Sequence, residues 1–143
     1  MGTASRQAKV RDREPARMHP EDARARGLSD ADVVRVHNDR GSALAGLRID
    51  SAVRPGVIQM STGAWYDPQL DESGARLEVH GNPNVLTADS GTSRLAQGPS
   101  AHSALVEVVA HHGRLPALAV SRPPPLVTGR DSEPDTEPTE GES

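Results

Sequence analysis

Short apolar alternations, separated by turn residues, run through most of the chain. Residues 32–37 alternate as a strand does, residues 38–41 (Asn-Asp-Arg-Gly) are typical of a turn, and residues 42–49 continue as a partner strand. After a second turn at residues 54–56, residues 57–60 form a short apolar run, and residues 104–109 alternate once more. The pattern predicts a mainly β domain.

One short helix is predicted between residues 19 and 27. Pro20 suits the first helical position, Glu21 and Asp22 suit the positive end of the helix dipole, and Gly27 suits the residue after the helix. Residues 67–76 are polar and predict an exposed loop, whereas residues 90–97 predict a single helical turn.

The two ends of the chain differ from its middle. Residues 1–14 predict a basic N-terminal arm, and no apolar alternation precedes Lys9. Residues 111–143 are rich in proline and end in an acidic stretch, which predicts a disordered tail. A single domain over residues 15–110 is therefore expected.

Composition narrows the function classes. With 143 residues, 34% hydrophobic residues, one Trp, one Tyr and no Phe, the chain has room for one domain with a thin core. A net charge of −4 argues against nucleic-acid binding. There is no cysteine, no apolar run long enough for a membrane helix and no secretory signal, so a cytoplasmic location is expected.

The stretch from His80 to Thr87 carries the strongest candidate chemistry. Asn82 and Asn84 flank Pro83, and each amide offers both donors and an acceptor, which suits the edge of a flat heterocycle. An ordinary turn, using Asn and Pro for geometry alone, is the competing interpretation.

Neighbouring residues add to this candidate site. Trp65 and Tyr66 could stack on a ligand or plug one end of the domain. Thr92 and Ser93 could cap a helical turn or hold phosphate oxygens, and Gln97 adds a further amide.

In this order the motifs resemble the C-terminal dinucleotide-binding domain of molybdopterin oxidoreductases, in the branch of the dimethyl sulfoxide, trimethylamine N-oxide and biotin sulfoxide reductases. The resemblance runs from about Lys9 to Val108. It rests on five segments: His19-Pro20-Glu21-Asp22-Ala23, residues 33–41, Thr62-Gly63-Ala64-Trp65-Tyr66-Asp67-Pro68, residues 80–87 and residues 91–98.

The resemblance implies a double-psi β-barrel, of the aspartate-decarboxylase-like class, that caps a larger enzyme and holds part of a bis(molybdopterin guanine dinucleotide) molybdenum cofactor. The barrel's first strand is not found, and no position matches the family's metal ligand, so no catalytic residue and no turnover by this chain alone are expected. The cofactor-binding residues implied are His80, Asn82, Asn84 and Gln97 for pterin edges, Thr92 and Ser93 for pterin or phosphate oxygens, and Trp65 and Tyr66 for packing.

Two functional hypotheses follow. The chain is the C-terminal part of an S- or N-oxide reductase, with the remaining enzyme domains or a partner subunit as its partners. Alternatively it is a non-catalytic binding or subunit-docking module, or a remnant without function.

Overall fold

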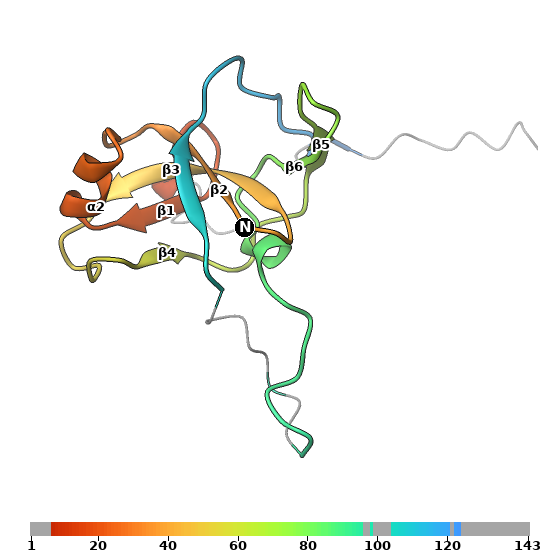
Figure 1. Cartoon of the computed structure of the whole chain (residues 1–143). Coiled ribbons are helices and arrows are strands. Elements are labelled where there is room, and N and C mark those ends of the chain that lie inside the picture. The colour runs from red at the N-terminus through yellow and green to blue at the C-terminus, as the bar shows by residue number, and fades with distance from the viewer. Residues whose placement is uncertain (1–6, 96–97, 99–103, 121, 124–143) are drawn as a thin grey trace, which may run out of the picture.

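The protein is mainly β, as predicted. The computed structural model describes residues 7–95, 98, 104–120 and 122–123. Its elements are β1 (Pro15–Met18), α2 (Pro20–Ala25), β2 (Val33–His37), β3 (Ser42–Ile49), β4 (Ile58–Met60), β5 (Pro68–Leu70), β6 (Arg76–Glu78), the 3₁₀ helix η1 (Pro83–Leu86) and β7 (Glu107–Ala110). Figure 1 shows these strands wrapped around a small core, with α2 at one side.

The β2–β3 hairpin lies at the centre of the sheet and confirms the predicted pair of strands. The strands pair antiparallel, from Val33 opposite Gly46 to His37 opposite Ser42. Asn38 closes the turn, because its Oδ1 accepts the backbone N–H groups of Arg40 and Gly41 at 2.9 and 3.3 Å. An Asn side chain that replaces a backbone acceptor in this way is a recurrent turn device.

Strand β1 is an element that the sequence analysis missed. It lies parallel to β3, with Pro15 opposite Gly46. Packing begins upstream of it, because Val10, Arg13 and Glu14 are buried. Val10 lies directly over Gly46, so a β-carbon at residue 46 would clash with the valine side chain. These contacts lie within the predicted N-terminal arm; the domain limits themselves stay predictions.

The exposed loop predicted at residues 67–76 is wrong in part: residues 72–75 are an exposed turn, but strand β5 begins at Pro68 and pairs antiparallel with β6. Asp71 forms the turn between them and accepts the Ser73 hydroxyl at 2.6 Å and the backbone N–H groups of Ser73 and Ala75 at 3.0 Å each. The Ser73 hydroxyl bond, the largest cause, holds the pKa of Asp71 below its usual range, and the backbone bonds and Arg35 add to this. The predicted helical turn is also not found at residues 90–95.

The core divides into two small clusters. The larger one joins β1, α2, β2, β3, η1 and β7 through mostly small aliphatic residues: Ala16, Met18, Ala23, Leu28, Val34, Val36, Ala45, Leu47, Leu86 and Val108. The smaller cluster comprises Val33, Leu44, Leu77 and Val79. No Phe contributes to either, so stability depends on polar anchors as well as apolar burial.

The sheet stays open between β4 and β7. Its order is β4-β1-β3-β2-β7, so within the described part of the chain these two strands are the ends. Two adjoining hollows of about 230 and 300 Å³ lie between them, sharing Val57, Ile58, Ala104 and Val106.

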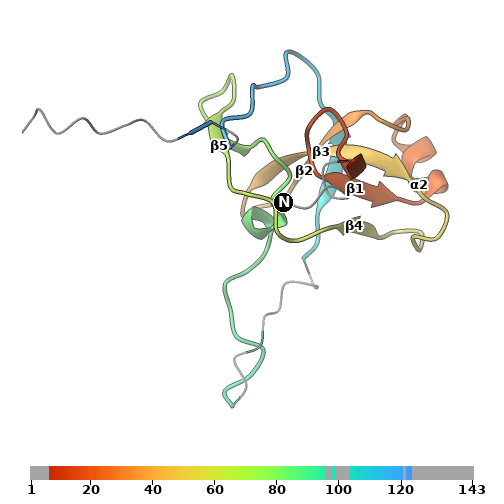
Figure 2. The same ribbon diagram turned by 180° about the vertical axis from the view of Figure 1, so that it is seen from behind.

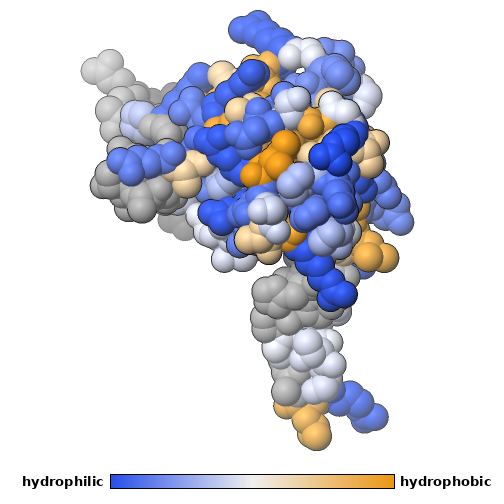
Figure 3. All heavy atoms as spheres, turned by 90° about the vertical axis from the view of Figure 1, so that its left-hand side faces the viewer, coloured by the Kyte–Doolittle hydropathy of each residue, from blue (hydrophilic) through white to orange (hydrophobic). Residues whose placement is uncertain are grey.

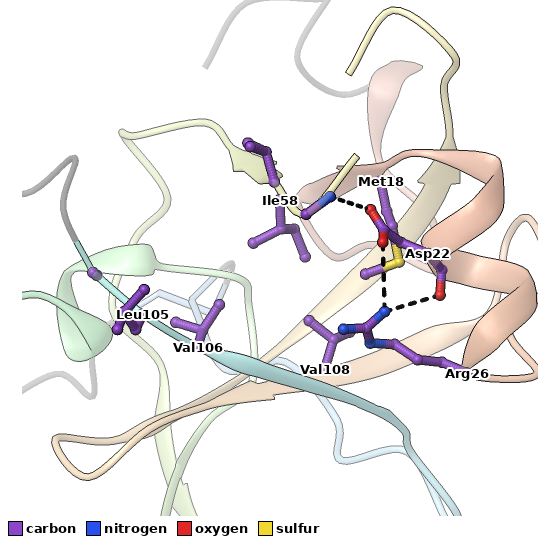
Figure 4. A pocket seen from close by; sticks show the side chains of 10 residues that line it. Met18, Asp22, Arg26, Ile58, Leu105, Val106 and Val108 are labelled. Atoms are coloured by element: carbon purple, nitrogen blue, oxygen red, sulfur yellow. Dashed lines mark hydrogen bonds and ion pairs between the residues drawn. The ribbon is translucent and has the colours of Figure 1, made fainter. Parts of the chain in front are cut away.

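Figure 4 shows Ile58 facing Val106 and Val108 across the first of these hollows, with Asp22 of α2 and Arg26, the residue that follows α2, at its rim. Figure 3 shows hydrophobic atoms exposed among polar ones on the side of the molecule that lies at the left of Figure 1. The two hollows together are called the β4–β7 groove below.

Two segments leave the sheet. The chain after η1 projects away from it, as Figures 1 and 2 both show. After β7, the chain runs back across the sheet to reach the β5–β6 hairpin. Among the described residues, no helix is long and apolar enough to cross a membrane. The cytoplasmic location stays a prediction.

Candidate functional site

Two loops, residues 61–67 and residues 79–82, meet around the buried carboxylate of Glu78. This side chain is only 1% exposed. Its Oε1 accepts the backbone N–H groups of Asp67 and His80 at 3.3 and 3.0 Å, and its Oε2 accepts those of Gly81 and Asn82 at 2.7 and 2.6 Å. An ionised carboxylate is acceptor-only and can take all four donors. Glu78 therefore fixes both loops at one point.

His80 adds a second link between the loops. It is 1% exposed, and its Nδ1 lies 3.0 Å from the carbonyl oxygen of Trp65. Its Nε2 contacts the ammonium group of Lys9, which also lies 3.3 Å from the Glu14 carboxylate. Because a lysine ammonium can only donate, Nε2 must accept and Nδ1–H must donate to Trp65. Both ring nitrogens are thus engaged inside the protein.

Asn82 is the third link. Its Nδ2 donates to the carbonyl oxygen of Ala64 at 3.0 Å, and its Oδ1 accepts the Asn84 N–H at 3.0 Å. It thereby caps η1, whose first residue is Pro83, a position that suits proline. The predicted pterin contacts of His80 and Asn82 stay predictions, and both side chains already have partners on the chain itself.

The clamped loops present a small set of exposed side chains. Trp65 is 66% exposed and Tyr66 is 49% exposed, so they do not plug the interior of the sheet. Asn84 is also exposed, and within the described residues its side-chain amide has no hydrogen bond. The structure therefore combines a rigid, buried base with two aromatic rings and one amide that are available to a ligand.

The other predicted site residues lie elsewhere. Thr92 and Ser93 are exposed and belong to the segment that projects away from the sheet. The Thr92 N–H donates to the Gly98 carbonyl at 3.1 Å, and the Ser93 hydroxyl accepts the Leu95 N–H at 3.3 Å. Gln97 lies outside the described residues.

Three buried charged residues at the site were missed from the sequence: Glu78, Asp67 and Arg13. Arg13 donates to the carbonyl oxygen of Arg11 at 2.9 Å and to that of Pro116 at 2.7 Å. Burial lowers the pKa of its guanidinium, while the nearby carboxylates of Asp12, Glu78 and Asp67 act in the opposite direction. A lone Glu within a short strand gives no signal of such a role, because most glutamates are exposed.

No group of three or more His, Asp or Glu side chains within the described part of the chain is placed to hold a metal ion. The candidate chemistry here is ligand holding by aromatic and amide groups.

The family described as "Molydopterin dinucleotide binding domain" matches residues 1–105. The dimethyl sulfoxide/trimethylamine N-oxide reductase of Rhodobacter capsulatus is 49% identical over 112 residues, which are 78% of this chain and 13% of that protein. The trimethylamine-N-oxide reductase of Haemophilus influenzae is 45% identical over 119 residues, 82% of this chain and 14% of that protein. Trimethylamine-N-oxide reductase 1 of Escherichia coli K12 is 48% identical over 111 residues, again 78% and 13%.

Proposed function

The chain belongs to the molybdopterin dinucleotide-binding domain family, and from this premise we propose that it is the cofactor-binding cap of a molybdenum oxidoreductase that reduces S- or N-oxides. It spans 13% to 14% of the length of the reductases named above. The observation that carries the proposal is the exposed set Trp65, Tyr66 and Asn84 on two loops that Glu78 locks together.

The side chains present fit a pterin dinucleotide. Asn84 offers a donor and an acceptor to a heterocycle edge, and the two aromatic rings offer flat surfaces to pack against it. His80 and Asn82 hold the backbone beneath these groups, and Thr92 and Ser93 offer hydroxyls to pterin or phosphate oxygens. The proposed group is bis(molybdopterin guanine dinucleotide), which supplies a metal centre for two-electron oxygen-atom transfer when bound. This chain's own residues bind and orient that group.

The β4–β7 groove supports the second half of the proposal, a larger enzyme around this domain. Valine, isoleucine and methionine side chains of β4 and the β7 segment form much of its walls, Asp22 and Arg26 lie at its rim, and the two strands beside it have unpaired edges within the described residues. One extended strand, apolar on alternate residues, would satisfy both edges and cover the larger core cluster. We propose that the rest of the reductase polypeptide supplies this strand and that the sheet then closes into a double-psi β-barrel. The same groove favours the second candidate function, a subunit-docking module.

A chimaera tests the cofactor assignment. The chain would replace the 112 residues that it matches in the R. capsulatus reductase, and molybdenum would be measured per purified protein. We expect Asn84→Ala to lower molybdenum content, since one lost hydrogen bond of about 1.4 kcal/mol weakens binding about tenfold. Trp65→Ala should also lower it, because the variant loses the flat surface against which the heterocycle packs. Ser51→Ala removes an exposed hydroxyl in the turn between β3 and β4, away from the loops of the site and from the β4–β7 groove, and serves as the control. A molybdenum content in both site variants equal to that of the unaltered chimaera would refute the assignment.

A charge placed in the groove tests the docking proposal. Val106→Asp puts a carboxylate into the groove, and Val109→Asp puts one on the exposed opposite face of β7. In the chimaera, we expect the first to lower the melting temperature more than the second. In the isolated 143-residue chain the two should differ less, because the groove wall faces solvent there. An equal effect of Val106→Asp in both proteins would count against an inserted strand.

A further inference from the structure

A segment that follows the matched dinucleotide-binding domain, residues 1–105, is built into the candidate site. Residues 115–120, here called the strap, lie against the β5–β6 hairpin, whereas the family match ends at residue 105. Figures 1 and 2 show the chain after β7 running across to this hairpin. Composition assigned these residues to a disordered tail, so their contacts call for a separate explanation.

Backbone and side-chain contacts dock the strap. The Arg13 guanidinium donates to the Pro116 carbonyl at 2.7 Å, and Gln69 Nε2 donates to the Ala117 carbonyl at 2.7 Å. Leu115 and Leu118 pack against the smaller core cluster. The two leucines, three residues apart, thus cover that cluster, while the carbonyls of the two residues between them accept hydrogen bonds. This is the pattern of a docked segment.

Asp67 joins the strap to the aromatic loop. Its side chain is nearly fully buried, and its Oδ2 accepts the N–H groups of Ala119 at 2.6 Å and Val120 at 3.2 Å. On the other side, its own N–H donates to Glu78 and its carbonyl accepts the Val79 N–H at 3.0 Å. Two consecutive N–H donors on one carboxylate oxygen form charge-assisted bonds, which are stronger than neutral ones.

Asp67 also follows the two exposed aromatic residues directly. Tyr66 and Trp65 have solvent on their outer side, and their backbone is held at the Trp65 carbonyl by His80 and at Asp67 by Glu78 and the strap. Releasing the strap removes the hydrogen bonds that it makes to Asp67 and leaves both aromatic rings chemically unchanged.

We propose that the strap is a positioning element of the cofactor site and that Asp67 is the positioning residue through which it orders Trp65 and Tyr66. The role of these rings in holding a cofactor rests on the function proposed above. The ordering of the loop by the strap does not rest on it, and the two are tested separately.

Trp65 is the only tryptophan, so its fluorescence reports this loop directly. Ala119→Pro removes the N–H that makes the 2.6 Å bond to Asp67, at an exposed position. Losing one charge-assisted bond should raise the population with an undocked strap about tenfold or more. In the 143-residue chain we expect lower Trp65 anisotropy and faster acrylamide quenching, with circular dichroism unchanged.

Ala117→Pro is the matched control, because its N–H makes no hydrogen bond among the described residues and its carbonyl acceptor is kept. A chain that ends at Arg114 is the second variant, should Ala119→Pro not fold. Asp67→Asn keeps an acceptor oxygen, whereas Asp67→Ala does not. Trp65 anisotropy in Asp67→Asn should therefore lie closer to that of the unaltered chain than in Asp67→Ala. If Trp65 anisotropy and quenching in folded Ala119→Pro or in the shortened chain equal those of the unaltered chain, the proposal is overturned.

The chimaera separates this inference from the proposed function. Loss of Trp65 order together with loss of molybdenum supports both. Loss of Trp65 order with full molybdenum supports the strap and overturns the role of the aromatic rings in cofactor binding.

Discussion

Replacing Glu78 by Gln is the sharpest perturbation of this fold, because it changes one atom at the junction of two loops. The carboxylate accepts four backbone N–H groups, two on each oxygen. Gln has almost the same shape, but one of its two terminal atoms is an NH₂ group that can only donate. Whichever way the amide turns, two buried N–H groups then face a donor.

The cost follows from those two groups. Each buried donor left without an acceptor costs about 1–3 kcal/mol, so Glu78→Gln should lower the free energy of unfolding by about 2–6 kcal/mol. The loss of a negative charge near the buried Arg13 guanidinium acts in the same direction. A domain of this size has about 5–15 kcal/mol in total, so the variant should lose a large share of its stability.

Urea unfolding of the 143-residue chain, followed by Trp65 fluorescence and by circular dichroism, measures the effect. Glu107→Gln is the control, since Glu107 is exposed on β7 and should change the free energy by less than about 0.5 kcal/mol. If Glu78→Gln also stays within about 0.5 kcal/mol of the unaltered chain, the carboxylate is not what joins the loops, and the account of the site given above is wrong.

Two further predictions test the turns. Gly81 and Gly74 both have positive φ, +103° and +80°, but a β-carbon at Gly81 would come within 2.8 Å of the Glu14 side chain, whereas Gly74 faces open space. Gly81→Ala should therefore lower the melting temperature more than Gly74→Ala. Equal decreases in melting temperature would refute the close contact. The pKa of Asp71 is lowered in the folded state, so its ionised carboxylate stabilises the fold above the unfolded pKa, and this stability is lost as pH falls through the folded pKa. Ser73→Ala removes the hydroxyl bond and should raise the folded pKa of Asp71. An unchanged NMR titration of Asp71 in this variant would contradict the assigned cause.

Local chemistry made part of the fold predictable. The β2–β3 hairpin carries its own turn signal in Asn38, and α2 carries its own end signals in Pro20 and Gly27. Strand β1 was missed because its partner on β3 lies far away in sequence and only four residues pair, one of them an exposed Arg17. Strand β5 was missed because it has three residues and begins with a proline.

The site residues stay predictions, and the sequence did not indicate which of their polar atoms would bind neighbouring backbone and which would be exposed. The motif at residues 80–87 drew attention to His80 and Asn82, yet their polar atoms hold neighbouring backbone, and the exposed residues are Asn84, Trp65 and Tyr66. Which amide faces inward depends on Glu78, whose burial results from tertiary packing rather than from any local pattern.

The strap also has a consequence for the order in which the protein can mature during its synthesis. During translation, Asp67 is made long before its partners Ala119 and Val120, which follow 52 and 53 residues later. The partner of Arg13, the Pro116 carbonyl, follows 103 residues after it. Because domains begin to fold from the N-terminus while translation continues, the aromatic loop would emerge with Asp67 still lacking its last partners. The aromatic loop of a nascent domain would thus stay less ordered until the strap is made. The proposed cofactor could bind during this interval, before the loop is fixed.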